Sequence, residues 1–315
     1  MCLKYVVWLL ALRAAVSFVA IKSFRRSKLR MVQERRGGAP TLPSGDFRPK
    51  QSLGQNFLCD RNYIYKICDS FRDESENGRT VIELGSGAGA LTEVLFERYS
   101  DMIAVDIDQR SIELLSASMP KLGLIQSDVL QINYSELAKA RGGKLNVIGN
   151  LPYHITSQIL FMLCDHHRCI NKAVVTLQLE VAQRIVASPN TKEYGILSVV
   201  YQLYAVPKIL FKIPPTAFYP QPKVMSALVG LNFTGKGPNV NEKDLKKVIG
   251  TSFQQRRKML RQSLKPILDN GKSVPEKFST MRPEQLDPQQ FVELTKAIFG
   301  ESRAENKPVW RSIKV

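Results

Sequence analysis

The sequence predicts an α/β fold, in which a doubly wound, Rossmann-like parallel sheet is followed by a small helical domain. Four short apolar segments between residues 80 and 150 have the composition of buried strands. A glycine-rich turn follows the first of them, and a basic segment with helical periodicity follows residue 240. With 315 residues, 44% of them hydrophobic, the chain can form one large domain and one small one.

The first predicted strand, residues 80–84, leads into a glycine-rich turn and then a helical pattern that begins at Leu91. Glycine lets the backbone approach a ligand more closely than a side chain would allow. The spacing of Gly85, Gly87 and Ala90 fits the looser form of the dinucleotide-binding motif. The turn alone therefore leaves NAD and S-adenosylmethionine equally open as cofactors.

The next two predicted strands each end near an aspartate. Residues 102–105 precede Asp106, which lies 21 positions after Gly85, where an acid commonly binds ribose hydroxyls. Residues 122–125 precede Asp128, which could accept a hydrogen bond from an adenine amine. A lone aspartate is more often a helix cap or a solvated charge. Polar groups at successive strand ends favour a ligand site at one edge of the sheet.

The fourth predicted strand, residues 145–149, ends at Asn150, and Leu151, Pro152 and Tyr153 follow it. The Asn150 side-chain oxygen and the Leu151 carbonyl could each accept one N–H of an exocyclic amine, while Tyr153 stacks on the base. Two acceptors would localise the nitrogen lone pair without a strong base. By themselves, these four residues fit an Asn-Pro turn equally well.

These motifs resemble those of the ribosomal RNA small-subunit adenine N6-dimethyltransferase family over residues 49–299. Residues 52–58 resemble the opening motif of that family, and residues 218–227 resemble its Phe-x-Pro-x-Pro-Lys-Val-x-Ser motif. The resemblance implies S-adenosylmethionine as the cofactor. The cofactor-binding residues predicted in this way are Gln55, Asn56, Leu58, Gly85, Gly87, Asp106, Asp128 and Asn150.

The same resemblance implies the activity, which is N6,N6-dimethylation of two adjacent adenines in small-subunit ribosomal RNA. The predicted catalytic residues are Asn150, Leu151, Tyr153 and Phe218, with Phe218 closing the second face of the adenine. The expected partner is this RNA or a pre-ribosomal particle, bound by a monomer. His154 stands where many members have asparagine, and we assign it no catalytic role.

Three other functions stay open at this stage. A methyltransferase of the antibiotic-resistance type would act on large-subunit RNA, and a DNA methyltransferase is a weaker alternative. A non-catalytic or dual-role nucleic-acid-binding factor would act in organellar transcription or ribosome assembly. The intact glycine turn and the residues around Asn150 favour an enzyme.

The net charge of +17 is concentrated at the two ends of the chain. Residues 1–50 carry +9, residues 51–240 carry +1 and residues 241–315 carry +7. We predict a methyltransferase domain at 49–233, a linker at 234–240 and a helical RNA-binding domain at 241–315. An amphipathic helix through residues 253–264 would present cations to RNA phosphates, unless it is only a solvated face. The predicted RNA-binding residues are Arg256, Arg257, Lys258 and Arg261.

Residues 1–48 have the composition of a targeting leader. The apolar run at 5–12 is too short to span a membrane, and residues 15–17 form a small-x-small cleavage pattern. Residues 18–36 hold seven basic side chains and one acid. A signal peptide followed by a transit-like segment resembles the address of secondary plastids. We therefore predict a plastid protein, with the mitochondrion as the alternative and no membrane association after processing.

The chain has five cysteines, an odd number that disfavours a disulfide framework. Residues 164–169 contain two cysteines and two histidines, which would suit zinc, but their spacing is too cramped. We predict no metal site.

Overall fold

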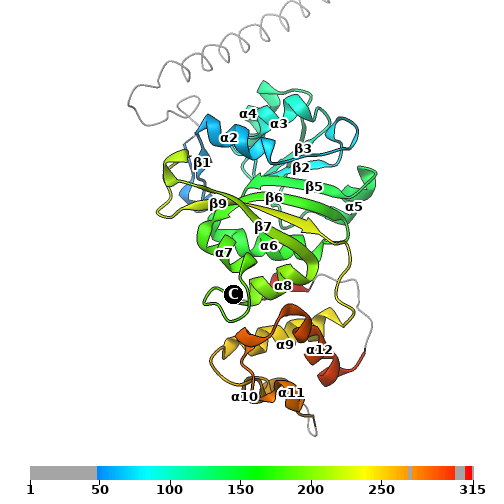
Figure 1. The fold of residues 1–315 in the computed structure, drawn as a ribbon. Helices are drawn as coiled ribbons and strands as arrows, with labels where there is room; N and C mark the ends of the chain where they lie inside the picture. Colours follow the sequence, from blue (N-terminus) through cyan, green and yellow to red (C-terminus); the bar gives the residue numbers. More distant parts are fainter. Residues whose placement is uncertain (1–47, 269–271, 302–308, 314–315) are drawn as a thin grey trace, which may run out of the picture.

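The computed structural model describes residues 48–268, 272–301 and 309–313, so nearly all of the predicted leader lies outside the described residues. A seven-stranded sheet with helices on both faces forms the larger part, and a cluster of helices lies beside it (Figure 1). The strand order is β4-β3-β2-β5-β6-β9-β7. The strands are β2 (Val81–Leu84), β3 (Ile103–Asp106), β4 (Gly123–Gln126), β5 (Leu145–Asn150), β6 (Ile170–Gln178), β7 (Ala205–Ile213) and β9 (Ser226–Phe233).

The sheet reverses its winding direction between β2 and β5. From β2 the chain adds β3 and β4 on one side and then returns to add β5 and β6 on the other, with all five strands parallel. At such a switch point the carboxyl ends of the strands open a crevice for ligands. β9 is antiparallel to both β6 and β7. All four predicted strands are present, with bounds that differ by one residue.

Helices cover both faces of the sheet, and its central strands β2, β3 and β5 are therefore buried on both sides. Alternate residues of β3 show this, since Ile103 and Val105 pack on one face and Ala104 on the other. One face carries α2 (Arg61–Asp69), α3 (Thr92–Arg98) and α4 (Gln109–Ser118). The other carries α5 (Tyr134–Ala140), α6 (Thr156–Asp165), α7 (Leu179–Val186) and α8 (Ile196–Tyr204). The doubly wound prediction is confirmed.

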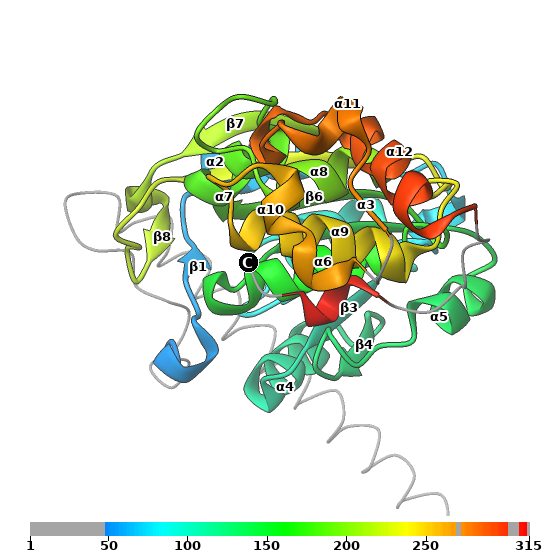
Figure 2. The same ribbon diagram turned by 90° about the horizontal axis from the view of Figure 1, so that it is seen from below.

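The C-terminal helices lie next to α8 (Figures 1 and 2). They share its hydrophobic core. They are α9 (Glu242–Gln254), α10 (Leu260–Ser263), α11 (Glu276–Ser279) and α12 (Pro288–Phe299). Residues 234–241, between β9 and α9, contain neither helix nor strand. Leu245, Val248 and Phe291 are completely buried and belong to the same cluster as Tyr194 and Tyr201 of the larger part. The domain boundaries stay a prediction.

The prediction of one helix through residues 253–264 is wrong. α9 ends at Gln254 and α10 begins at Leu260, so Arg256, Arg257 and Lys258 lie in the turn between them. Arg256 forms an ion pair with Glu284 at 2.7 Å and donates to the carbonyl oxygens of residues 191 and 192. The Leu260 N–H donates to the Met281 carbonyl. These acceptors on other segments favour a reversal of the chain over a continuing helix.

Residues 309–313 return from the helical cluster to the end of α6. The buried Asp165 carboxylate accepts hydrogen bonds from the backbone N–H groups of Val309, Trp310 and Arg311, at 2.7, 2.8 and 3.2 Å. Trp310 is fully buried, and its Nε1 donates to the Tyr204 hydroxyl. Of the helices in the described ranges, none is long and apolar enough to cross a membrane.

Candidate cofactor and active site

A cavity of about 280 Å³ opens at the carboxyl ends of the parallel strands. This volume is near the lower end of the range for small-molecule sites. Its walls come from the strand ends and from the segment that precedes α2. All eight predicted cofactor residues line it, as does the predicted catalytic Leu151: Gln55, Asn56, Leu58, Gly85, Gly87, Asp106, Asp128, Asn150 and Leu151.

The glycine turn lines one side of this cavity. Gly85 and Gly87 have φ values of 74° and 52°, in the left-handed region that favours glycine. A Cβ atom on Gly87 would lie 2.9 Å from the Phe57 ring, so the turn and the segment before α2 can meet only because this residue is glycine. The Gly85 N–H donates to the Val105 carbonyl at 2.9 Å, which fixes the turn to β3.

Asp106 links the glycine turn to the residue that precedes α4. Its Oδ2 accepts from the Gly87 N–H at 2.7 Å, and its Oδ1 accepts from the Asp108 N–H at 2.8 Å. Burial raises the pKa of this carboxyl, and the backbone N–H groups of Asp108, Gly87 and Ile107 act against that rise. A carboxylate oxygen can accept more than one hydrogen bond, so Asp106 is also suited to accept from ribose hydroxyls. Asp128 lies on the same cavity and accepts from the Leu130 N–H at 2.9 Å.

Glu83 is a second buried acid of the cavity, which the sequence analysis did not identify. It ends no strand but lies inside β2, with 1% of its surface exposed. Its Oε2 has no hydrogen-bond partner among the described residues. Burial, together with the neighbouring Asp106, raises its pKa to about 8. The available signal was an acid in an otherwise apolar strand directly before the glycine turn.

Asn150 presents an unused acceptor to the cavity. Its Nδ2 donates to the Asn56 carbonyl at 2.9 Å, which fixes the amide orientation. Its Oδ1 is buried and has no hydrogen-bond partner within the described part of the chain. A buried acceptor without a donor destabilises the folded protein, so a ligand N–H that donates to this oxygen would bind favourably. The neighbouring Leu151 is buried and anchored by its N–H to the Thr176 carbonyl at 3.1 Å.

Tyr153 and Phe218 do not line this cavity. The Tyr153 hydroxyl lies 2.5 Å from Ser226 Oγ, so the motif around Asn150 is attached to the start of β9. Phe218 is only 1% exposed and pairs with Leu58 where β1 (Phe57–Leu58) meets β8 (Phe218–Tyr219). The structure thus holds Phe218 in the core, behind a residue of the cavity wall. Its stacking on an adenine stays a prediction.

The four predicted RNA-binding cations differ in their environments. Arg257, Lys258 and Arg261 are exposed, whereas Arg256 is partly buried and bonded to Glu284 and two carbonyls. The contact of these four side chains with RNA stays a prediction. Arg257, Lys258 and Arg261 already expose their charge to solvent, whereas Arg256 would have to break its bonds to do so.

The cysteine and histidine cluster packs against the returning C-terminal segment. His167 Nδ1 lies 2.9 Å from the Cys164 carbonyl, and His166 Nε2 lies 3.1 Å from Arg311 Nη2. Cys164 and Cys169 are free thiols. Over the described ranges, no group of three or more His, Cys, Asp and Glu could hold a metal ion. That the protein uses no metal stays a prediction.

The unused Asn150 oxygen shares its cavity with Asp106 and the glycine turn. An amine bound to Asn150 would therefore lie beside a cofactor that carries a ribose. This is the arrangement of an S-adenosylmethionine-dependent methyltransferase that acts on an amine.

Residues 46–298 match the family model described as ribosomal RNA adenine dimethylase, and the chain belongs to this family. It is 42% identical over 277 residues to ribosomal RNA small subunit methyltransferase A of Salinibacter ruber, covering 86% of this chain and 92% of that relative. The protein of the same name from Parabacteroides distasonis is 40% identical over 254 residues, covering 79% and 93%. The chain is thus an enzyme that dimethylates ribosomal RNA adenine with S-adenosylmethionine.

Solved structures show the same fold at lower identity. A dimethyladenosine transferase from Plasmodium falciparum superposes with a TM-score of 0.63 at 22% identity, covering 75% of this chain and 94% of the other. The 23S rRNA methyltransferase ErmE superposes with a TM-score of 0.57 at 23% identity, covering 77% and 99%.

Proposed function

We propose that this enzyme dimethylates N6 of two adjacent adenines in small-subunit ribosomal RNA and so contributes to ribosome biogenesis. The names of the relatives at 42% and 40% identity support the choice of the small subunit. The single structural observation that supports amine methylation is the buried Asn150 Oδ1, which has no hydrogen-bond partner among the described residues.

In the proposed mechanism, the Asn150 side-chain oxygen and the Leu151 carbonyl each accept one N–H of the adenine amine. The two acceptors turn the nitrogen lone pair out of conjugation with the ring and toward the methyl carbon. S-adenosylmethionine, when bound, supplies that methyl group on a sulfonium. Tyr153, oriented by its bond to Ser226, stacks on a base that has left its helix. For Phe218 to close the other face of the base, its ring must leave the buried position that it has in this structure.

We further propose that the partner is small-subunit ribosomal RNA or a pre-ribosomal particle, bound by a monomer. The exposed cations Arg257, Lys258 and Arg261 support contact with RNA phosphates. A plastid destination is supported by the signal-like and transit-like composition of residues 1–48. A fluorescent fusion of these residues would test it, and delivery to mitochondria would favour the alternative.

The central test is Asn150→Ala. Loss of one preorganised acceptor should lower methyl transfer about a hundredfold, which corresponds to about 3 kcal/mol. Asn146→Ala is a matched control, because Asn146 lies on the same strand at the end away from the cavity. Mass mapping of methylated adenines in small-subunit RNA is the readout, with large-subunit RNA and duplex DNA assayed in parallel.

Near-normal transfer by the Asn150 variant would contradict the mechanism. Preferred methylation of large-subunit RNA or DNA by the unaltered enzyme would contradict the substrate. If the variant supported ribosome assembly as well as the wild type, the non-catalytic role would gain support.

A further inference from the structure

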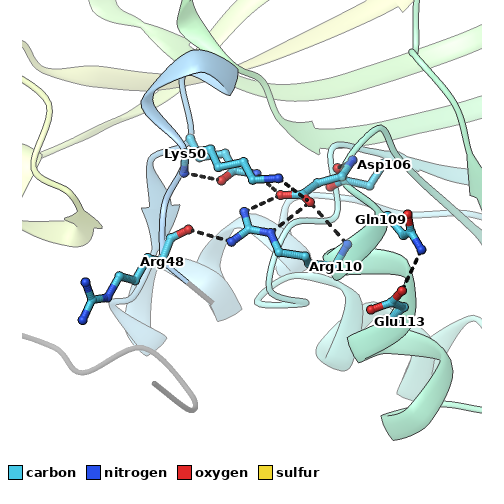
Figure 3. A network of polar contacts seen from close by, with 8 residues as sticks. Arg48, Lys50, Asp106, Gln109, Arg110 and Glu113 are labelled. Carbon is cyan, nitrogen blue, oxygen red and sulfur yellow. Dashed lines mark hydrogen bonds and ion pairs between the residues drawn. The ribbon is translucent and has the colours of Figure 1, made fainter. Parts of the chain in front are cut away.

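Asp108 is the centre of a polar cluster just outside the cofactor cavity. Figure 3 shows the side chains of Lys50 and Arg110, which belong to this cluster, close to Asp106. Only 1% of the Asp108 side chain is exposed, although Asp108 is the first residue before α4. Arg110 donates to both of its oxygens, with Nη2 at 2.6 Å from Oδ2 and Nε at 3.1 Å from Oδ1. Gln55 Nε2 lies 3.1 Å from Oδ2, and Lys50 Nζ lies 3.5 Å from Oδ1. The donors from Arg110, and then Gln55, hold the pKa of Asp108 well below its ordinary value.

The same cluster fastens residues 48–56, which we call the N-terminal strap. Arg110 Nη1 donates to the Arg48 carbonyl at 3.1 Å, and the Lys50 N–H donates to Gln55 Oε1 at 2.8 Å. The other end of the strap is held where the Asn56 carbonyl accepts from Asn150 Nδ2. The strap is therefore attached to α4 at one end and to the last residue of β5 at the other.

The strap forms one wall of the cofactor cavity. Gln55 and Asn56 both line that cavity, but the Gln55 side-chain amide is already bonded to Asp108 and Lys50. The Asp108 N–H in turn donates to Asp106, whose other oxygen accepts from Gly87. One line of polar contacts thus joins the strap, the ribose-binding acid and the glycine turn.

We propose that Asp108 and Arg110 are positioning residues that hold the strap in its cofactor-binding conformation before the cofactor arrives. Without them, S-adenosylmethionine must order the strap as it binds, and that entropy cost lowers its affinity. Once the cofactor is bound the strap is ordered in either case. The transfer step at saturating cofactor then proceeds unchanged.

The contacts between Arg110 and Asp108 are strong enough that removing them should change the cofactor affinity measurably. A guanidinium that donates twice to one buried carboxylate has both geometric specificity and charge-assisted bonds. The Arg110 side chain is 30% exposed, so solvent screens part of its attraction to Asp108. We expect the cofactor dissociation constant to rise about tenfold without Arg110, and the difference to shrink at high salt.

The experiment compares Arg110→Ala with Gln109→Ala, a neighbour on α4 whose exposed amide bonds to Glu113 at 2.8 Å. Calorimetry without RNA measures S-adenosylmethionine affinity, and hydrogen exchange measures protection of the strap with and without cofactor. Arg110→Ala should bind about tenfold more weakly, exchange faster in the strap only when the cofactor is absent, and keep its kcat. Arg110→Lys, which keeps the charge, should lie between this variant and the wild type.

Asp108→Asn is a second variant, because its side-chain oxygen still caps α4 while the charge is lost. It should show the same weaker binding and faster strap exchange. Unchanged affinity and exchange in both Arg110→Ala and Asp108→Asn would overturn the proposal, as would an equal loss in Gln109→Ala. A fall in kcat with unchanged affinity would also overturn it. Because binding is measured without RNA, failure here is distinct from failure of the proposed substrate.

Discussion

Replacing Glu83 by glutamine should remove a pH dependence from the free energy of unfolding. Glu83 has an ordinary pKa of 4.5, which burial raises to about 8 in the folded protein. Between these values the folded chain keeps a proton that the unfolded chain has released. The free energy of unfolding therefore falls as the pH rises from 4.5 through about 8 and stays low above that window.

The magnitude follows from the width of this window. One pH unit corresponds to about 1.4 kcal/mol for a single proton, so the loss is at most about 5 kcal/mol. Glutamine has nearly the same shape and no charge to desolvate. We expect Glu83→Gln to match the wild type near pH 5 and to be more stable by up to about 5 kcal/mol near pH 8.5.

Urea unfolding at pH 5, 6.5 and 8.5 measures this difference directly. Glu113→Gln is the matched control, since Glu113 is exposed on α4 and loses no buried charge. Parallel pH profiles for the wild type and Glu83→Gln would refute the reasoning. Equal flattening by Glu113→Gln would refute it as well, because the effect would then be unrelated to burial.

Two further predictions concern the C-terminal part. Changing Arg257, Lys258 and Arg261 together to alanine should weaken ribosomal RNA binding and reduce its salt slope by about 0.7 to 0.9 per lost phosphate contact. Filter binding at several salt concentrations tests this, and an unchanged slope would leave these cations as a solvated surface. Trp310→Ala should lower the free energy of unfolding by about 3 to 5 kcal/mol, because it empties a fully buried site. Unaltered urea unfolding would show that Trp310 does not dock in solution.

The strands were predictable because their signals are local. Residues 81–84 and 145–149 are short apolar runs that are buried on both faces, and each ends at a turn or polar residue that the sequence shows directly. The helix through residues 253–264 was wrong for the opposite reason. Its periodicity continues past Gln254, but the bonds of Arg256 to Glu284 and to residues 191 and 192 are non-local.

The candidate site divides in the same way. Asp106 and Asn150 are the last residues of their strands, so parallel pairing brings them to one cavity. The burial of Phe218 depends on pairing with Leu58, 160 positions earlier, which no local pattern shows. Asp108 is recognisable in the sequence only as a helix cap, a role that it also fulfils.

The C-terminal helices are joined to the larger part at more than one place. The chain enters them through residues 234–241 and returns at 309–313, where Asp165 binds three successive N–H groups. Arg256 adds a third connection through its bonds to the carbonyl oxygens of residues 191 and 192, and the two parts share one hydrophobic core. A body held at several points around an apolar interface cannot swivel as a tethered domain would. The exposed cations Arg257, Lys258 and Arg261 are therefore held at a fixed position relative to Asn150.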